Sequence, residues 1–191
     1  AFASQAKEFP NLVQGLAGTV KAVFGVKPDP DFTSLAEAPR TIFNVNVTPQ
    51  RRVATQATSL ERLKAIGEEA GGSINDVVLA ASSGAMRRFL LEIGELPRKS
   101  LVTSIPVALP RDSNQAGGNA ISFANVRLGT DIEDVRERFD VIRRSSTAGR
   151  EFLKQMSTKT LMDYTVLISS PQILTRLPGI GSRVPPTYNV I

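Results

Sequence analysis

The sequence contains no cysteine and no histidine. Without cysteine the chain cannot form a disulfide, a thiolate metal site or a cysteine nucleophile. Without histidine it cannot supply a Ser-His-Asp triad, an imidazole general base or a zinc site of the usual kind. If the chain is part of an enzyme, its general base must therefore be a carboxylate or a lysine, or must come from outside these 191 residues.

Tryptophan is also absent and there are only two tyrosines, so a base-stacking platform is poorly supplied and we expect no nucleic-acid partner. No apolar run reaches the roughly 20 residues that span a bilayer, and the N-terminal residues do not resemble a signal peptide. We therefore expect a cytoplasmic protein. The net charge of +5 favours anionic ligands, including phosphate-rich molecules or an anionic membrane surface.

Hydrophobic periodicity predicts an α/β fold, a layered domain with a mixed sheet flanked by helices. Helices are expected at 10–24, 58–71, 73–93, 130–146 and 157–178, the last interrupted at Pro171. Strands are expected at 41–47, 51–58, 99–109, 119–128 and 187–191. Three prolines indicate a linker at 25–40, so residues 1–40 are assigned to a helix and connector and residues 41–191 to the main domain.

Local patterns predict where three of these helices begin. Capping-box spacings pair Thr58 with Glu61, Ser73 with Asp76, and Thr130 with Glu133. In the last of these helices a stripe of buried positions is expected along one face, at Ile132, Val135, Phe139, Ile142 and Ser146.

The stretch "GGSINDVVLAASSGAMRRFL", residues 71–90, holds the most informative candidates for a site. The capping box explains Asp76, whose carboxylate also gains from the positive end of the helix dipole, but it does not explain Asn75. The side chains at Ser82, Ser83 and Gly84 are very small, so another element or a narrow ligand can approach the backbone. Two readings remain: a helix buried in a core, or one that also lines a ligand channel.

Arginine and glycine supply the candidate phosphate contacts. Three arginine pairs, at 51–52, 87–88 and 143–144, could bind phosphate, although adjacent arginines are more often solvated. Arg111 is more suggestive, because it follows an expected strand and strand ends in α/β sheets often border ligand crevices. Gly118 and Asn119 are expected on the same rim, where backbone N–H groups of a glycine-rich turn can cradle phosphate.

Several segments, taken together, resemble a known family. "TIFN" followed by "RR", then residues 71–90, then "SIPVALPRDS" and "GGNAISFANVRL" are similar in order and spacing to the second half of the bacterial wax ester synthase/diacylglycerol acyltransferase family. The similarity covers nearly all of residues 41–191, and residues 1–40 resemble the connector from the first half.

This resemblance implies a chloramphenicol acetyltransferase-like fold built from two halves with a tunnel between them. In such proteins a histidine of an H-H-x-x-x-D-G motif in the first half is the general base on an alcohol, which attacks an acyl-CoA thioester. Neither that motif nor the family's later Asn-Val-Pro motif is present in this chain. The chain is accordingly expected to be part of the enzyme and to lack its catalytic histidine.

The resemblance also implies roles for individual residues and partners. The family's Asn-Asp motif falls on Asn75 and Asp76, which are expected to support the active site rather than act as a base. The expected partners are the first half of the enzyme, acyl-CoA as substrate rather than cofactor, a fatty alcohol or diacylglycerol, and a membrane or lipid-inclusion surface. The rival readings are a condensation-type domain of a peptide synthetase and a non-catalytic lipid-binding scaffold.

Overall fold

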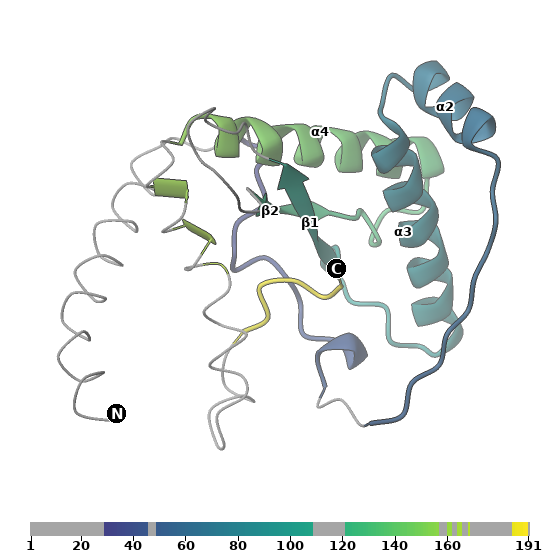
Figure 1. Cartoon of the computed structure of the whole chain (residues 1–191). Coiled ribbons are helices and arrows are strands. Elements are labelled where there is room, and N and C mark those ends of the chain that lie inside the picture. The colour runs from purple at the N-terminus through teal and green to yellow at the C-terminus, as the bar shows by residue number, and fades with distance from the viewer. Residues whose placement is uncertain are drawn as a thin grey trace, which may run out of the picture.

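The computed structural model describes residues 29–45, 49–108, 121–156, 160, 161, 164, 165, 168 and 185–190. The elements follow the order η1 (Ile42–Asn44), α2 (Leu60–Glu69), α3 (Ile74–Glu92), β1 (Val102–Ala108), β2 (Ile121–Arg127) and α4 (Val135–Lys154). Figure 1 shows α4 lying along one side of the β1–β2 pair, with α3 beside it and α2 at the end of α3. Within the described residues, no helix is long and apolar enough to cross a membrane.

The described sheet combines antiparallel and parallel pairing. Strands β1 and β2 are antiparallel, with Val102 opposite Arg127 and Ala108 opposite Ile121. On the other edge of β1 the C-terminal residues run parallel to it, in a bridge between Thr103 and Val190. The amide of Ser104 donates to the carbonyl of Val190 at 3.1 Å, so backbone bonding continues across β1. The prediction of a mixed sheet with helices packed on it is confirmed.

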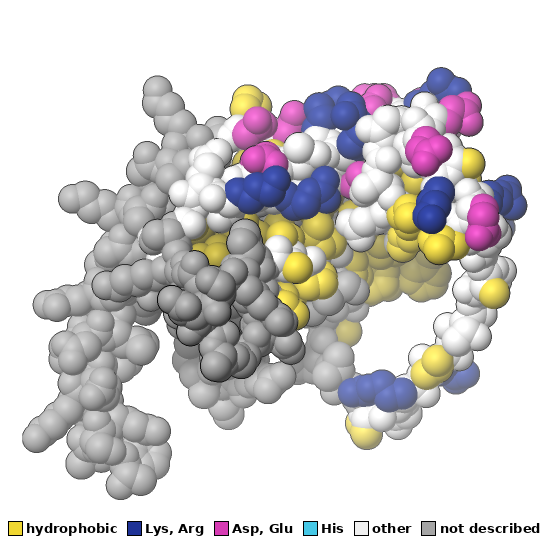
Figure 2. All heavy atoms as spheres, turned by 45° about the horizontal axis from the view of Figure 1, so that its top comes forward, with side chains coloured by type: hydrophobic (Ala, Val, Ile, Leu, Met, Phe, Trp, Pro, Cys, Tyr) yellow, Lys and Arg dark blue, Asp and Glu magenta, His cyan; other side chains and the backbone are white. Residues whose placement is uncertain are grey.

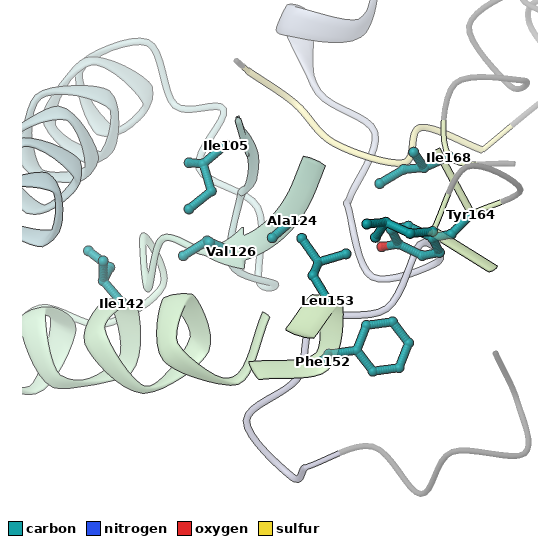
Figure 3. Packing of buried hydrophobic residues seen from close by; sticks show 9 residues of the cluster. Ile105, Ala124, Val126, Ile142, Phe152, Leu153, Tyr164 and Ile168 are labelled. Carbon is teal, nitrogen blue, oxygen red and sulfur yellow. The ribbon is translucent and has the colours of Figure 1, made fainter. Parts of the chain in front are cut away.

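The main core lies between α4 and the sheet (Figure 3). Ala124 and Val126 of β2 face Ile142 and Leu153 of α4, and all four side chains are almost completely buried. Gly149 permits this close approach, because a Cβ at that position would lie 3.0 Å from the Cβ of Ala124. The apolar stripe of α4 is thus buried against the strand that precedes it in the sequence.

Neither of the two strands predicted near the start of the main domain forms among the described residues, and residues 46 and 47 of the first lie outside them. Residues 42–44 form the short helix η1, because Thr41 and Asn44 make a local capping box that competes with extended pairing. Asn44 also donates to the carbonyl of Tyr188 at 3.1 Å, which fixes this turn against the C-terminal segment. Residues 51–58 form no strand in the structure, and every one of them is exposed.

Two predicted helix starts are displaced. Ser59, not Thr58, caps α2, since its side chain accepts from the amide of Arg62. Asp134, not Thr130, caps α4. Thr130 is fully buried instead, where its hydroxyl accepts from the amide of Leu101 at 2.8 Å. Val135 is consequently at the exposed first position of α4, with 64% of its surface accessible, and does not belong to the buried stripe.

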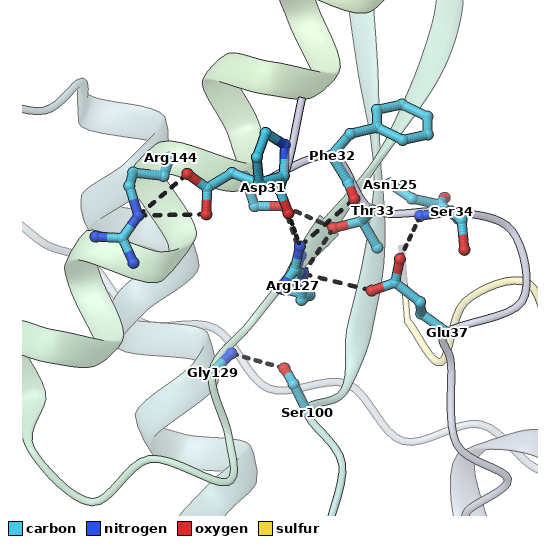
Figure 4. Close-up of polar contacts among 12 residues, drawn as sticks. Asp31, Phe32, Thr33, Ser34, Glu37, Ser100, Asn125, Arg127, Gly129 and Arg144 are labelled. Atoms are coloured by element: carbon cyan, nitrogen blue, oxygen red, sulfur yellow. Dashed lines mark hydrogen bonds and ion pairs between the residues drawn. The ribbon is translucent and has the colours of Figure 1, made fainter. Parts of the chain in front are cut away.

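The described part of the predicted linker, residues 29–40, is irregular but packs closely on the domain (Figure 4). The hydroxyls of Thr33 and Ser145 are 2.7 Å apart, and Arg127 pairs with Glu37 at 3.4 Å. The ring of Phe32 lies 4.3 Å from that of Phe152, centroid to centroid. We refer to residues 29–40 as the docked connector. The predicted helix at 10–24 and most of the one at 157–178 lie outside the described residues.

Candidate functional site

The N-terminus of α3 has the capping box that the sequence predicts. The hydroxyl of Ser73 accepts from the amide of Asp76 at 3.3 Å, and the Asp76 carboxylate atom Oδ2 accepts from the amide of Ser73 at 2.9 Å. The Ser73 hydroxyl also donates to Oδ2 at 2.7 Å. The amides of the cap residue Ser73 and of Asp76 are therefore satisfied, and the carboxylate lies at the positive end of the helix dipole.

Asp76 has a second role that capping does not describe. Its other oxygen, Oδ1, accepts a 2.6 Å hydrogen bond from the hydroxyl of Ser146, in the middle of α4. Both side chains are buried, with 1% of Asp76 and none of Ser146 accessible. A carboxylate this deeply buried is strongly destabilising unless hydrogen bonds compensate it, and here donors reach both oxygens. Asp76 thus joins the start of α3 to α4.

The turn before α3 also packs against α4. A Cβ at Gly72 would lie 2.6 Å from Cζ of Phe139 and 3.4 Å from Oδ2 of Asp76. Only a glycine leaves room for the Phe139 ring, which comes from α4. The double glycine at 71–72 therefore both ends the preceding helix segment and admits α4 to the base of α3.

Asn75, the neighbour of Asp76, points the other way. Its side chain is exposed and makes no hydrogen bond to any other described residue. Along α3 the positions three, seven, ten and fourteen residues later are also exposed, and they hold Val78, Ser82, Ala85 and Phe89. These five residues follow one side of the helix, which we call the outer face of α3. Asn75 heads a face of otherwise small or apolar side chains.

The small-residue patch does not form a single surface, because successive helix positions turn by about 100°. Ser82 is exposed on the outer face, whereas Ser83 is fully buried and donates its hydroxyl proton to the carbonyl of Leu128. Gly84 is half-buried and faces the guanidinium of Arg138: a Cβ added at Gly84 would lie 3.6 Å from a terminal nitrogen of that group. Of the three, Ser82 alone shares the outer face with Asn75.

The arginine pairs differ in how they are used. Arg87 donates to the carbonyl of Thr130 at 2.7 Å, and Arg88 pairs with Glu92 on the helix surface. Arg143 pairs weakly with its helix neighbour, and Arg144 reaches Asp31 of the docked connector at 3.3 Å (Figure 4). Arg111, Gly118 and Asn119 lie in 109–120, outside the described residues, so their assignment as acyl-CoA contacts stays a prediction.

Three polar residues with structural roles were not singled out as interacting groups from the sequence: Ser146, Arg138 and Asn189. Arg138 is 6% accessible and donates to the carbonyls of Ile132 and Glu133, holding the turn before α4. Asn189 accepts from the amide of Val102 and donates to Pro39 and Asn44. Ser146 alone had a sequence signal, since it occupies a polar place on an apolar stripe.

Among the described residues, Tyr164 is the buried group whose pKa is most clearly displaced. Burial raises its pKa to about 12, and its ring packs edge-on against Phe152 at 5.8 Å. The phenol is therefore neutral at physiological pH and belongs to the core. It is not a candidate base.

Comparison with known proteins identifies the family. Residues 1–78 match the wax ester synthase/diacylglycerol acyltransferase catalytic domain, and residues 117–191 match the C-terminal domain of the same proteins. The chain belongs to the wax ester synthase/diacylglycerol acyltransferase family. The first match ends at Val78, in the first turns of α3, and the second begins at residue 117, after β1 and before β2.

Relatives within this acyltransferase family are longer than the chain. A Mycobacterium tuberculosis H37Rv protein that carries the name diacyglycerol O-acyltransferase Rv3480c is 38% identical over 81% of this chain and 32% of its own length. Another from that strain, Rv3740c, is 34% identical over 93% of this chain and 42% of its own. The chain thus spans about a third to two-fifths of these relatives.

A solved structure supports the fold of this family member. The wax ester synthase/diacylglycerol acyltransferase from Marinobacter aquaeolei VT8 aligns with a TM-score of 0.66 at 27% sequence identity. The alignment covers 95% of this chain and 38% of that one. The predicted chloramphenicol acetyltransferase-like α/β architecture is confirmed.

Proposed function

We propose that this chain forms the second half of an O-acyltransferase that moves a fatty acyl group from acyl-CoA to a long-chain alcohol or to diacylglycerol. The match of its two ends to the catalytic and C-terminal domains of the wax ester synthase/diacylglycerol acyltransferase family carries this proposal. Because the chain contains no histidine, the general base comes from the first half of the enzyme.

In this reaction the base removes the proton of the acceptor hydroxyl, whose oxygen attacks the thioester carbonyl. The acyl group moves to that oxygen, and the CoA thiolate leaves and takes up the proton. The chain contributes one wall of the reaction space through the outer face of α3. An amide such as that of Asn75 cannot act as a base at neutral pH, but it can hold a bound carbonyl or a neighbouring group in place.

The division of labour between Asn75 and Asp76 supports this role. The carboxylate of Asp76 is buried and already accepts hydrogen bonds at both oxygens, so it fixes the helix. The amide of Asn75 is exposed and unbonded among the described residues, which leaves it available to a substrate or to the first half. The two residues of the family motif thus have separate tasks.

The remaining assignments follow from the same proposal. Acyl-CoA acts as a substrate, and no resident cofactor is required. Arg111, Gly118 and Asn119 contact the CoA phosphates, and Ser82 lies on the acyl-binding wall. The enzyme acts in the cytoplasm and at the surface of membranes or lipid inclusions, where its acceptor and product collect; the net positive charge favours such anionic surfaces.

The test is release of CoA by a chimera in which the part of Rv3740c that precedes its match to this chain is placed before residue 1. With palmitoyl-CoA and hexadecanol or diolein, we expect CoA release that depends on the acceptor. The chain alone and the Rv3740c segment alone are the matched controls. A folded chimera that releases no more CoA than the two separate parts contradicts the proposal.

A further inference from the structure

Residues 49–59, which we call the strap, connect η1 to α2 without joining any sheet. Figures 1 and 2 both show the strap standing clear of the rest of the described chain, with open space between it and the body. All its residues are exposed, and Val53 is 89% accessible, the largest fraction among the large hydrophobic residues that the structure describes. Nothing within the described chain holds this segment in place by packing.

The backbone in the middle of the strap shows the same lack of partners. Residues 52–58 make no backbone–backbone hydrogen bond to any described residue, whereas Ser59 caps α2 and its carbonyl accepts from the amide of Leu63. An extended run with open N–H and C=O groups on both sides is a template for strand pairing. Holding the strap in one conformation costs conformational entropy, so an ordered strap needs contacts that compensate this cost.

The sequence of the strap favours a strand. Val53, Thr55 and Ala57 alternate with Ala54 and Gln56, and residues 52–58 contain neither proline nor glycine. Alternation with β-branched residues is typical of a strand with one side buried. The sequence pattern predicts a strand, and none of the described residues pairs with it.

We infer that the strap is a β-strand that pairs with an edge strand of the first half of the acyltransferase, and so joins the two halves through the backbone. This rests on the proposed function, which supplies the first half as partner. The strap lies wholly within residues 1–78, which match the catalytic domain, whereas β2 and α4 match the C-terminal domain. The elements on either side of the strap, η1 and α2, fall within the same match, so the strap lies in a segment of catalytic-domain sequence.

A second copy of the chain is a less suitable occupant. The relatives are more than twice as long as this chain, so the first half supplies a larger partner surface within the same molecule. Pairing within one molecule has a high effective concentration, whereas pairing of two straps depends on the protein concentration. The strap–strap dimer is therefore the alternative that the experiment must distinguish.

Amide hydrogen exchange of residues 52–58 tests the inference in the Rv3740c chimera and in the chain alone. We expect these amides to exchange rapidly in the chain alone and about tenfold or more slowly in the chimera. Rapid exchange in a folded chimera overturns the inference. Protection in the chain alone that increases with its concentration also overturns it, since it shows strap–strap pairing.

Proline substitution supplies a second readout. Successive N–H groups of a strand point to opposite sides, so A54P and T55P remove donors from the two edges in turn. We expect at least one of them to lower CoA release by the chimera about tenfold relative to A54S and T55S. Neither should shift thermal unfolding of the chain alone, because the strap has no backbone partner there. In a chimera that releases CoA, equal release by all four variants overturns the inference.

The two readouts separate this inference from the proposed function. CoA release without protection of 52–58 contradicts the paired strap and leaves the acyltransferase assignment intact. Protection of 52–58 without acceptor-dependent CoA release supports the paired strap and contradicts the assigned reaction.

Discussion

Replacing Ser146 by alanine removes the donor to Oδ1 of Asp76 and changes little else. The two atoms are 2.6 Å apart, and neither residue is more than 1% accessible, so water cannot easily replace the lost hydroxyl. Leaving a buried charged acceptor without its donor costs about 1–3 kcal/mol or more. We expect S146A to lower the free energy of unfolding by about 2–3 kcal/mol, which for a chain of this size lowers Tm by roughly 4–12 °C.

The assay is urea unfolding of the chain followed by circular dichroism, with T147A as the matched control. Thr147 is the next residue of α4, but its side chain is exposed, so its loss should change stability by less than about 0.5 kcal/mol. A double-mutant cycle with D76A should give a coupling energy of about 1–2 kcal/mol. If S146A and T147A are equally stable, the Asp76–Ser146 bond does not hold α3 to α4.

Three further predictions concern the packing of the domain. G72A should be destabilising by about 1–3 kcal/mol, because the new Cβ would lie 2.6 Å from the Phe139 ring, and F139L should recover part of the loss; equal unfolding midpoints for G72A and the unaltered chain contradict this. R127Q removes the ion pair to Glu37, so trypsin should cleave the docked connector at Arg40 at least several-fold faster in R127Q than in the control R88Q, which loses only a surface ion pair. Equal cleavage rates in the two variants would show that other contacts hold the connector. Burial raises the pKa of Tyr164 from 10.0 to about 12, so between these pH values the folded state keeps a proton that the unfolded state loses; the stability is therefore complete below pH 10 and falls as the pH rises toward 12. Y164F should remove up to about 2–3 kcal/mol of this pH dependence, and parallel curves of stability against pH for Y164F and the unaltered chain contradict this.

Local sequence signals predicted the start of α3 and the position of β1 and β2 well. The Ser73–Asp76 capping box formed because its partners are three residues apart and need no tertiary contact. The same reasoning failed at Thr130, where a competing long-range bond to Leu101 draws the side chain into the core and leaves the cap to Asp134. Capping patterns predict that a helix begins nearby, but tertiary contacts decide at which residue.

The candidate site was predictable in part. The sequence separated Asn75 from Asp76 because capping accounted for one and not the other, and the structure shows one exposed and one buried. The local pattern explained Asp76 only as a helix cap, although a polar Ser146 on a predicted apolar stripe indicated that some buried group needed a donor. Which group that was depends on the packing of α3 against α4, and no local pattern encodes that contact.

The failed strands at 41–47 and 51–58 have different physical origins. Around η1 a local Thr41–Asn44 capping box is reinforced by the C-terminal residue Asn189, a contact across about three-quarters of the sequence that only the folded structure reveals. In the strap the alternation is correct for a strand, but a strand forms only with a partner. Sequence patterns predict strand propensity, whereas pairing is a property of the whole assembly.

The central claim is that Asn75 works at the reaction while Asp76 holds the helix, and kinetics of N75A in the Rv3740c chimera test it most directly. Because Asn75 is exposed and unbonded among the described residues, N75A should leave Tm unchanged within about 1 °C. The loss of a positioned amide should lower kcat for acceptor-dependent CoA release by about tenfold or more. Full activity in N75A, or a loss of activity matched by a loss of stability, would contradict the account.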